Sequence, residues 1–118
     1  TTEELISATI VAAAEMGAAV AAQPVTDTIK ESADGEMISN TVDRSRLWSV
    51  QTPQTFRVDV IRKDFSAARE KGLVLTDDTA ACEVIGQQVK LISSVSPNPK
   101  VTVPGDLPYI ETLLQRQV

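Results

Sequence analysis

Two segments of the chain combine cations with hydroxyl and amide side chains, the groups that hold phosphate oxygens in proteins. They are residues 41–56, TVDRSRLWSVQTPQTF, and residues 98–102, NPKVT. Arginine presents a planar fork that can bind two phosphate oxygens at once, whereas lysine supplies a compact positive charge. Arg44 and Lys100 could therefore hold a phosphate group, although an isolated surface arginine or lysine is more often a solvated charge.

The chain contains no histidine and a single cysteine, Cys82. Within this chain, that excludes nucleophilic catalysis by a Ser-His-Asp or Cys-His arrangement and excludes histidine-ligated metals. Phosphoryl or nucleotidyl transfer suits the remaining side chains, since it depends mainly on positioning and charge stabilisation. Cys82 lies in an alanine-rich run, and we interpret it as a small core residue rather than a reactive thiol.

A third polar segment, Thr76-Asp77-Asp78, allows two interpretations. Paired carboxylates could bind a metal ion, but acidic residues at a helix start also complement the helix dipole, and we favour the second. Thr76 itself could bond a substrate or cap the helix. In the same way, Thr52 could bond a substrate or only shape the turn before Pro53.

The composition predicts a globular chain with an unusual core. Hydrophobic residues make up 42% of the 118 residues but aromatic residues only 3%, so alanine and aliphatic side chains must fill the core. We interpret Trp48 as a packing anchor rather than a stacking platform for a base.

The net charge of −5 argues against nucleic-acid binding, which needs a basic surface. No run of about 18 apolar residues occurs, so we expect no membrane span and a cytoplasmic protein.

The first elements that must position these residues are a helix and a strand. Thr1 and Glu4 have the spacing of a capping box, so we expect a helix over residues 1–16 that ends at Gly17. The apolar run 18–23 is of strand length and apolar on both faces. This pattern predicts a central strand of a parallel sheet.

A hairpin follows. Residues 25–30 alternate apolar and polar side chains, and residues 37–42 return as a second strand after a turn at Asp34-Gly35. A ribbon of two strands is marginally stable on its own. We therefore expect residues 25–44 to project from the body as an arm and to pack on another surface.

The remaining chain predicts three helices and a strand. We expect a helix over residues 59–71, a helix from Thr76 to Gly86, a strand over 89–95 and a helix from Pro104. Apolar side chains at steps of three and four predict the buried faces of the first and last helix, which are Val58, Ile61, Phe65 and Ala68, and Leu107, Ile110 and Leu114.

Helices that alternate with short strands predict an α/β fold. Only two convincing sheet strands are present besides the hairpin, and so small a sheet cannot cover its helices. We therefore expect residues 1–118 to form a single partial domain from which the N-terminal half of the sheet is missing.

Four motifs in order resemble the 2-C-methyl-D-erythritol 4-phosphate cytidylyltransferase family. They are DTIK at 27–30, TVDR–LW–QTPQ-F at 41–56, TDD–E at 76–83 and the N-x-K-x-T loop at 98–102. Pro99 departs from the isoleucine usual in that loop. The resemblance implies a truncated Rossmann-like nucleotidyltransferase sheet with a protruding β-hairpin dimerisation arm. The chain shows no match to the glycine-rich N-terminal loop with which the family binds CTP, so it resembles the C-terminal part.

The resemblance also implies a reaction and a site. The family transfers CMP from CTP to methylerythritol phosphate and releases pyrophosphate in non-mevalonate isoprenoid biosynthesis. By this resemblance Arg44 and Lys100 position the substrate phosphate, and Thr28, Thr52 and Thr76 bond the substrate. It further implies Mg²⁺ with ligands outside this chain and a homodimer whose arm delivers Arg44 to the partner's site. Its location would be the bacterial cytoplasm, or the plastid in a plant.

Three other interpretations remain open. Ribitol-5-phosphate cytidylyltransferases share the QTPQ-F motif but less often TVDR–LW. Alternatively, the arm and its supporting helices form a non-catalytic dimerisation module, or the chain is a proteolytic remnant. Because it lacks a triphosphate-binding loop, we expect this chain alone to be inactive.

Overall fold

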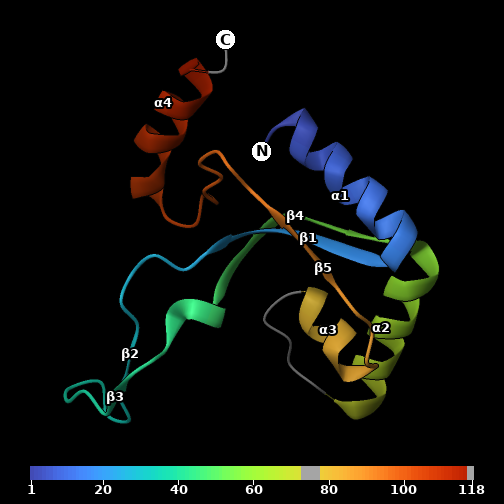
Figure 1. Ribbon diagram of the computed structural model, residues 1–118, viewed down its shortest axis with the longest axis horizontal. Helices are drawn as coiled ribbons and strands as arrows, with labels where there is room; N and C mark the ends of the chain where they lie inside the picture. Colours follow the sequence, from blue (N-terminus) through green and yellow to red (C-terminus); the bar gives the residue numbers. More distant parts are fainter. Residues whose placement is uncertain (73–77, 117–118) are drawn as a thin grey trace.

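A small mixed sheet organises the molecule. The computed structural model describes residues 1–72 and 78–116, and its main sheet has three strands in the order β4-β1-β5 (Figure 1). The central strand β1 (Ala18–Pro24) pairs antiparallel with β4 (Trp48–Phe56) and parallel with β5 (Lys90–Ser93). The predicted α/β class and the central position of β1 are confirmed, although the sheet is mixed rather than parallel.

The first helix, α1 (Glu3–Met16), ends at Gly17 as predicted. Gly17 has φ 96°, a left-handed conformation that favours glycine, and a Cβ there would lie 2.9 Å from Nε2 of Gln87. The predicted N-cap is wrong by one residue. Thr2, not Thr1, caps the helix by accepting the amide of Leu5 at 3.2 Å, and the Thr1 hydroxyl makes a contact described below.

Strand β4 was not predicted from the sequence. Its polar QTPQT run with an internal proline resembles a loop, but proline is tolerated in an edge strand. The register of β4 against β1 shifts in the middle of the strand: Val20 lies opposite Gln54, but Ala22 lies opposite Val50. The residues between, Gln51 to Pro53, therefore bulge opposite Ala21 alone.

Helices cover both faces of the sheet (Figure 1). Successive residues of a strand point to opposite faces. Thr55 points to α1, where its hydroxyl lies 2.9 Å from that of the buried Thr9. Phe56 points the other way and packs against a cluster of Ala18, Val60 and Cys82.

The second layer consists of α2 (Val58–Lys71) and α3 (Asp78–Val84). The extent of α2 and its end at Gly72 agree with the prediction, but its buried face agrees only in part: Ala68 is buried as predicted and Ile61 is half-buried. Val58 and Phe65 are 62% and 49% exposed, whereas Val60, Asp64 and Ala68 are buried. Val58 and Phe65 were predicted wrongly because the helix turns Asp64, a carboxylate, inward to α3.

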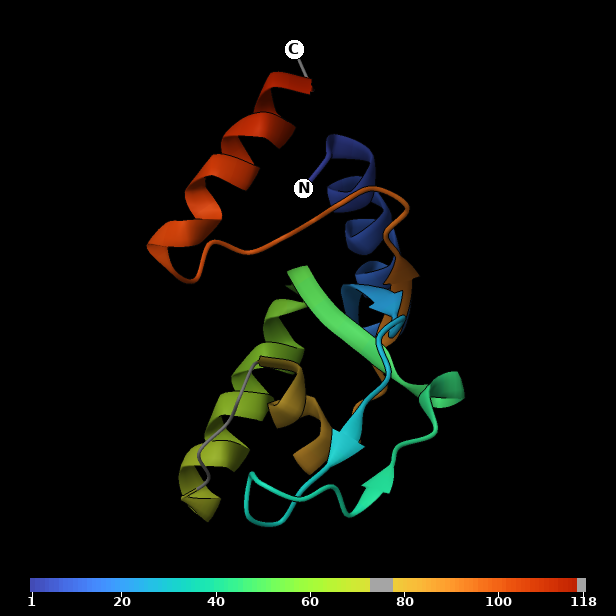
Figure 2. The same ribbon diagram turned by 90° about the vertical axis from the view of Figure 1, so that its left-hand side faces the viewer.

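The hairpin is a thin arm with two short strands, β2 (Lys30–Glu31) and β3 (Asn40–Thr41). It extends away from the sheet in both views, and Figure 1 shows it apart from α2 and α3 (Figures 1 and 2). All of residues 26–41 are exposed. The pairing is shorter than predicted, and the tip is held by Asp34, whose Oδ1 accepts the amides of Glu36 and Met37 at 2.9 Å each.

The chain closes with a short 3₁₀ turn, η2 (Pro104–Asp106), and α4 (Leu107–Arg116). None of the 10 residues of α4 is buried. The predicted buried face is therefore wrong: Leu107 and Leu114 are 51% and 56% exposed, because α4 stands apart from α1, α2 and α3 (Figure 2). Among the described helices, none is long and apolar enough to cross a membrane.

Candidate functional site

The bulge of β4 and the loop after β5 enclose a hollow of about 370 Å³. Because β5 lies on the far side of β1, the chain must cross back over the sheet to reach β4. Residues that the sequence separates widely thus meet at one place, and the hollow is lined by Val50, Gln51, Thr52, Gln54, Asn98, Pro99 and Lys100. Two predicted site residues, Thr52 and Lys100, belong to this lining.

Asn98 fastens the loop to the bulge. Its Nδ2 donates to the carbonyl oxygen of Thr52 and lies 3.4 Å from Oε1 of Gln51. Its Oδ1 accepts the hydroxyl of Thr1 at 2.8 Å. Asn98 is only 8% exposed, and a buried amide needs such partners. No role was predicted for this side chain from the sequence, although its position between two prolines is a signal that the backbone is constrained there.

Asp106 fastens the other end of the same loop. Its Oδ2 accepts the amides of Thr102 at 2.9 Å and Val103 at 3.1 Å. These amide bonds, that of Thr102 foremost, hold the pKa of the Asp106 carboxyl below its usual value. Lys100 therefore lies between two anchored points, with an exposed side chain that forms no ion pair within the described ranges.

Arg44 lies elsewhere, at the base of the arm. It opens a short 3₁₀ turn, η1 (Arg44–Arg46), that Asp43 caps by accepting the amide of Ser45 at 3.0 Å. This backbone bond, with a further bond from the Ser45 hydroxyl, lowers the pKa of the Asp43 carboxyl. The Arg44 guanidinium donates through Nη1 to the carbonyl oxygen of Thr26. This contact keeps the exposed arginine beside the start of the arm.

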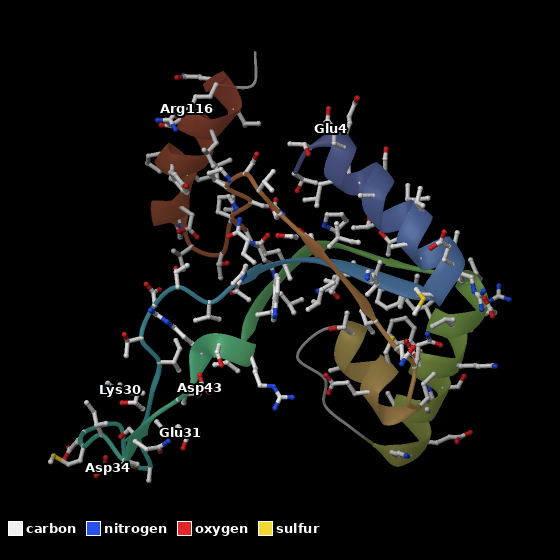
Figure 3. All side chains as sticks on the ribbon, viewed as in Figure 1. Glu4, Lys30, Glu31, Asp34, Asp43 and Arg116 are labelled. Atoms are coloured by element: carbon white, nitrogen blue, oxygen red, sulfur yellow. The ribbon has the colours of Figure 1, made fainter. Side chains whose placement is uncertain are left out.

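The predicted site residues thus fall into two groups. Thr52 and Lys100 line the hollow, whereas Thr28 and Arg44 belong to the exposed arm and are absent from that lining. Thr76 lies outside the described residues, as does Asp77. Figure 3 shows how far the arm carries its charged side chains, with Lys30, Glu31 and Asp34 gathered near its tip and Asp43 near its base.

The two residues with alternative interpretations can be placed. Trp48 begins β4, lies opposite Pro24 and is absent from the lining of the hollow. This position favours packing over base stacking. Cys82 is fully buried, in agreement with its interpretation as a core residue.

The hollow is polar and has a cation, a hydroxyl and several amides. Gln54 adds a buried Oε1 that meets no hydrogen-bond partner within the described part of the chain. Over residues 1–72 and 78–116, no group of three or more His, Cys, Asp or Glu side chains is placed to hold a metal ion. The cation, hydroxyl and amides of the lining suit an anionic ligand with hydroxyl groups.

The comparisons with known proteins agree on one family. The family model described as 2-C-methyl-D-erythritol 4-phosphate cytidylyltransferase matches residues 1–116. Proteins of that name from Alkaliphilus oremlandii and Geobacillus kaustophilus are 42% and 46% identical over 114 and 103 residues, which are 97% and 87% of this chain. They match over only 48% and 45% of their own lengths, so the chain spans about half of these curated relatives.

Solved structures give the same result for the fold. The chain superimposes on the crystal structure of 2-C-methyl-D-erythritol 4-phosphate cytidylyltransferase from Thermus thermophilus with a TM-score of 0.86 at 34% identity. The match covers 98% of this chain and 56% of that one. A second crystal structure, of 4-diphosphocytidyl-2C-methyl-D-erythritol synthase, matches at 34% identity with a TM-score of 0.79 and is covered over 50% of its chain.

Proposed function

Because the chain belongs to the 2-C-methyl-D-erythritol 4-phosphate cytidylyltransferase family, we propose that its protein transfers CMP from CTP to methylerythritol phosphate and releases pyrophosphate. The observation that carries the proposal is the hollow that brings Thr52 and Lys100 together from β4 and the loop after β5. We assign the chain to the C-terminal half of the enzyme, supported by the order of its four motifs, and regard residues 1–118 as a single partial domain with residues 25–44 as its arm.

The described residues would serve the acceptor substrate. An oxygen of the methylerythritol phosphate attacks the α-phosphorus of CTP, a new P–O bond forms, and the bond to pyrophosphate breaks. Two anions must approach each other in this step, so cations that hold the attacking phosphate in line contribute to the rate. We assign this role to Lys100 and Arg44, and hydrogen bonding of the substrate to Thr28, Thr52 and Thr76.

Arg44 and Thr28 would act in a neighbouring subunit. Both belong to the arm and neither lines the hollow. The arm exposes Ile29 by 38%, Met37 by 72% and Ile38 by 64%, an apolar surface that a second copy of the protein would bury. We therefore propose a homodimer in which each arm completes the partner's acceptor site.

Magnesium is part of the proposal only through the family. A divalent ion would offset charge on the triphosphate. Since the described residues contain no cluster of carboxylates, histidine or cysteine able to hold it, we assign it no ligand and no step in this chain. A cytoplasmic location is likewise proposed by family resemblance alone.

The test uses the longest form of the protein that its gene encodes. Pyrophosphate release is measured with CTP, Mg²⁺ and either methylerythritol phosphate or ribitol 5-phosphate. We expect turnover in the range of about one to a thousand per second with the first acceptor and little with the second.

Preference for ribitol 5-phosphate would assign the protein to the sister enzyme instead. Background rates with both acceptors would contradict the proposal and favour a non-catalytic dimerisation module. The 118-residue chain alone serves as the matched control, and we expect it to give only background.

A further inference from the structure

Asn98 joins three segments that lie far apart in the sequence. Its side chain contacts Thr1 at the start of α1 and both Gln51 and Thr52 in the bulge of β4. Its backbone belongs to the loop that carries Lys100. This buried side chain therefore ties the middle of the loop to α1 and β4. The start of the loop is held by Gln23 of β1, which donates to the carbonyl oxygens of Ser94 and Ser96, and its end by Asp106.

The flanking prolines extend the effect of this anchor along the loop. Pro97 and Pro99 each fix their own φ and restrict the residue before them to extended conformations. The backbone on both sides of Asn98 is therefore stiff. Lys100 follows directly after this stiff stretch. The anchored Asn98 therefore sets the backbone position from which the Lys100 side chain extends into the hollow.

The partners of Asn98 require an amide. Nδ2 faces two oxygen acceptors, the carbonyl of Thr52 and Oε1 of Gln51, while Oδ1 receives a hydroxyl from Thr1. The backbone carbonyl of Thr52 can only accept a hydrogen bond. The end of the Asn98 side chain that faces it must therefore be the nitrogen, Nδ2. An aspartate of nearly the same shape would place an oxygen against two acceptors, and the anchor would be repelled instead of held.

We propose that Asn98 is a positioning residue for the transfer reaction. Its side-chain amide is occupied by protein partners, so it acts through Lys100: it sets the placement of the Lys100 amino group relative to the Thr52 hydroxyl, and so the place of the acceptor phosphate. The inference rests on the proposed function for its chemistry, but the anchoring of the loop can be measured without any substrate.

The first test is kinetic and uses the longest form of the protein that its gene encodes. We expect Asn98→Asp to lower kcat/KM for methylerythritol phosphate by about tenfold to a hundredfold, as misplacement by about an ångström does, with KM for CTP changed less than about threefold. Gln88→Glu, the same chemical change at an exposed position, is the matched control and should leave both values unchanged.

The second test asks whether Asn98 acts through Lys100. If it does, Asn98→Asp should cause little further loss once Lys100→Ala is present, because coupled residues are not additive. Losses that multiply in the double variant would overturn the proposal. So would an Asn98→Asp protein with unchanged kcat/KM. If Asn98→Asp does not fold, Asn98→Ser, which introduces no charge, takes its place in the same cycle.

The third test separates this proposal from the proposed function. Amide hydrogen exchange of residues 98–102 is compared between the unmodified protein and Asn98→Asp without substrate. Faster exchange by at least about tenfold, equivalent to about 1.4 kcal/mol, supports the anchor. If exchange rises but the unmodified protein makes no product, the anchor stands and the proposed function fails. Unchanged exchange rejects the anchor whatever the activity.

Discussion

The thiol of Cys82 donates a hydrogen bond of 2.7 Å to Oδ2 of Asp64, and both side chains are fully buried. The bond joins α3 to α2 beneath the sheet. Oδ1 of the same carboxyl meets no hydrogen-bond partner within the described part of the chain. A buried carboxyl with one oxygen unsatisfied depends strongly on the donors that reach the other.

Cys82→Ala should therefore destabilise the fold by about 1–3 kcal/mol, the usual cost of removing a partner from a buried polar group. Cys82→Ser keeps a donor of similar reach and should cost less. Urea unfolding measures both, with Ser66→Ala at an exposed position of α2 as the control. An equal cost for serine and alanine would show that packing of the sulfur, rather than the hydrogen bond, stabilises the two helices.

Lys100→Ala in the longest form of the protein should lower kcat/KM for methylerythritol phosphate by at least about tenfold, because a cation is lost where two phosphates approach each other. Its folding stability should change by less than about 0.5 kcal/mol, since the side chain is exposed. Steady-state kinetics and thermal melts measure the two effects. Lys63→Ala, an exposed lysine on α2, is the control, and equal kinetics for both variants would refute the site assignment.

Arg44→Lys keeps the charge but loses the planar fork, so bidentate phosphate binding fails and kcat/KM should fall by at least about tenfold. If the arm acts in the partner's site, mixing inactive Arg44→Lys and Lys100→Ala proteins should restore part of the activity. A mixed dimer then holds one site with both native residues. Subunit exchange is first demonstrated independently. If activity then does not recover, Arg44 acts in its own subunit's site or in no site.

Deletion of residues 31–39 should weaken self-association, because it removes the tip of the arm together with the exposed Met37 and Ile38. Light scattering across a dilution series should show a dimer for the unmodified protein and a shift to monomer for the deletion. A protein that is monomeric with its arm intact would contradict the dimer proposal.

The loop that carries Lys100 should respond to acid through Asp106. Its pKa is lowered in the folded state, so its contribution to stability is present above the unfolded-state pKa and is lost as the pH falls through the folded value. Stability should therefore decrease below about pH 4, and less steeply for Asp106→Asn. Chemical denaturation between pH 7 and pH 3 measures the difference, with Glu70→Gln on α2 as the control. Parallel curves for Asp106→Asn and the unmodified protein would contradict the role of this carboxylate.

Helix ends could be predicted from sequence because a local signal fixes them. Gly17 and Gly72 both terminate their helices in the left-handed conformation. Strand β4 could not be predicted from a local signal, because its pairing with β1 and its bulge are tertiary features. Its polar, proline-containing sequence is typical of a loop. Part of the buried face of α2 was also predicted wrongly. Asp64 is buried because it contacts α3, and this tertiary contact is not visible in the sequence of α2.

The site could be predicted in part. The motifs identified Thr52 and Lys100, and the structure places both around one hollow, although their roles stay predictions. Asn98 lies in a predicted motif and between two prolines, but its anchoring role was missed because its three partners come from two other segments. The structure does not bring Arg44 or Thr28 into the same hollow, and that separation is what the proposed dimer would resolve.

The central strand also limits how this protein can vary. Ala18, Ala19, Ala21 and Ala22 are all 0% exposed and lie between helical layers on both faces of the sheet. Only glycine is smaller than alanine, so nearly every substitution in β1 adds volume to a space that is already filled, which costs about 1–3 kcal/mol for each well-packed position. Tolerance to mutation should therefore be lowest at these four alanines, whose side chains are the least distinctive in the sheet, and a library that randomises these four positions should return alanine and glycine almost alone.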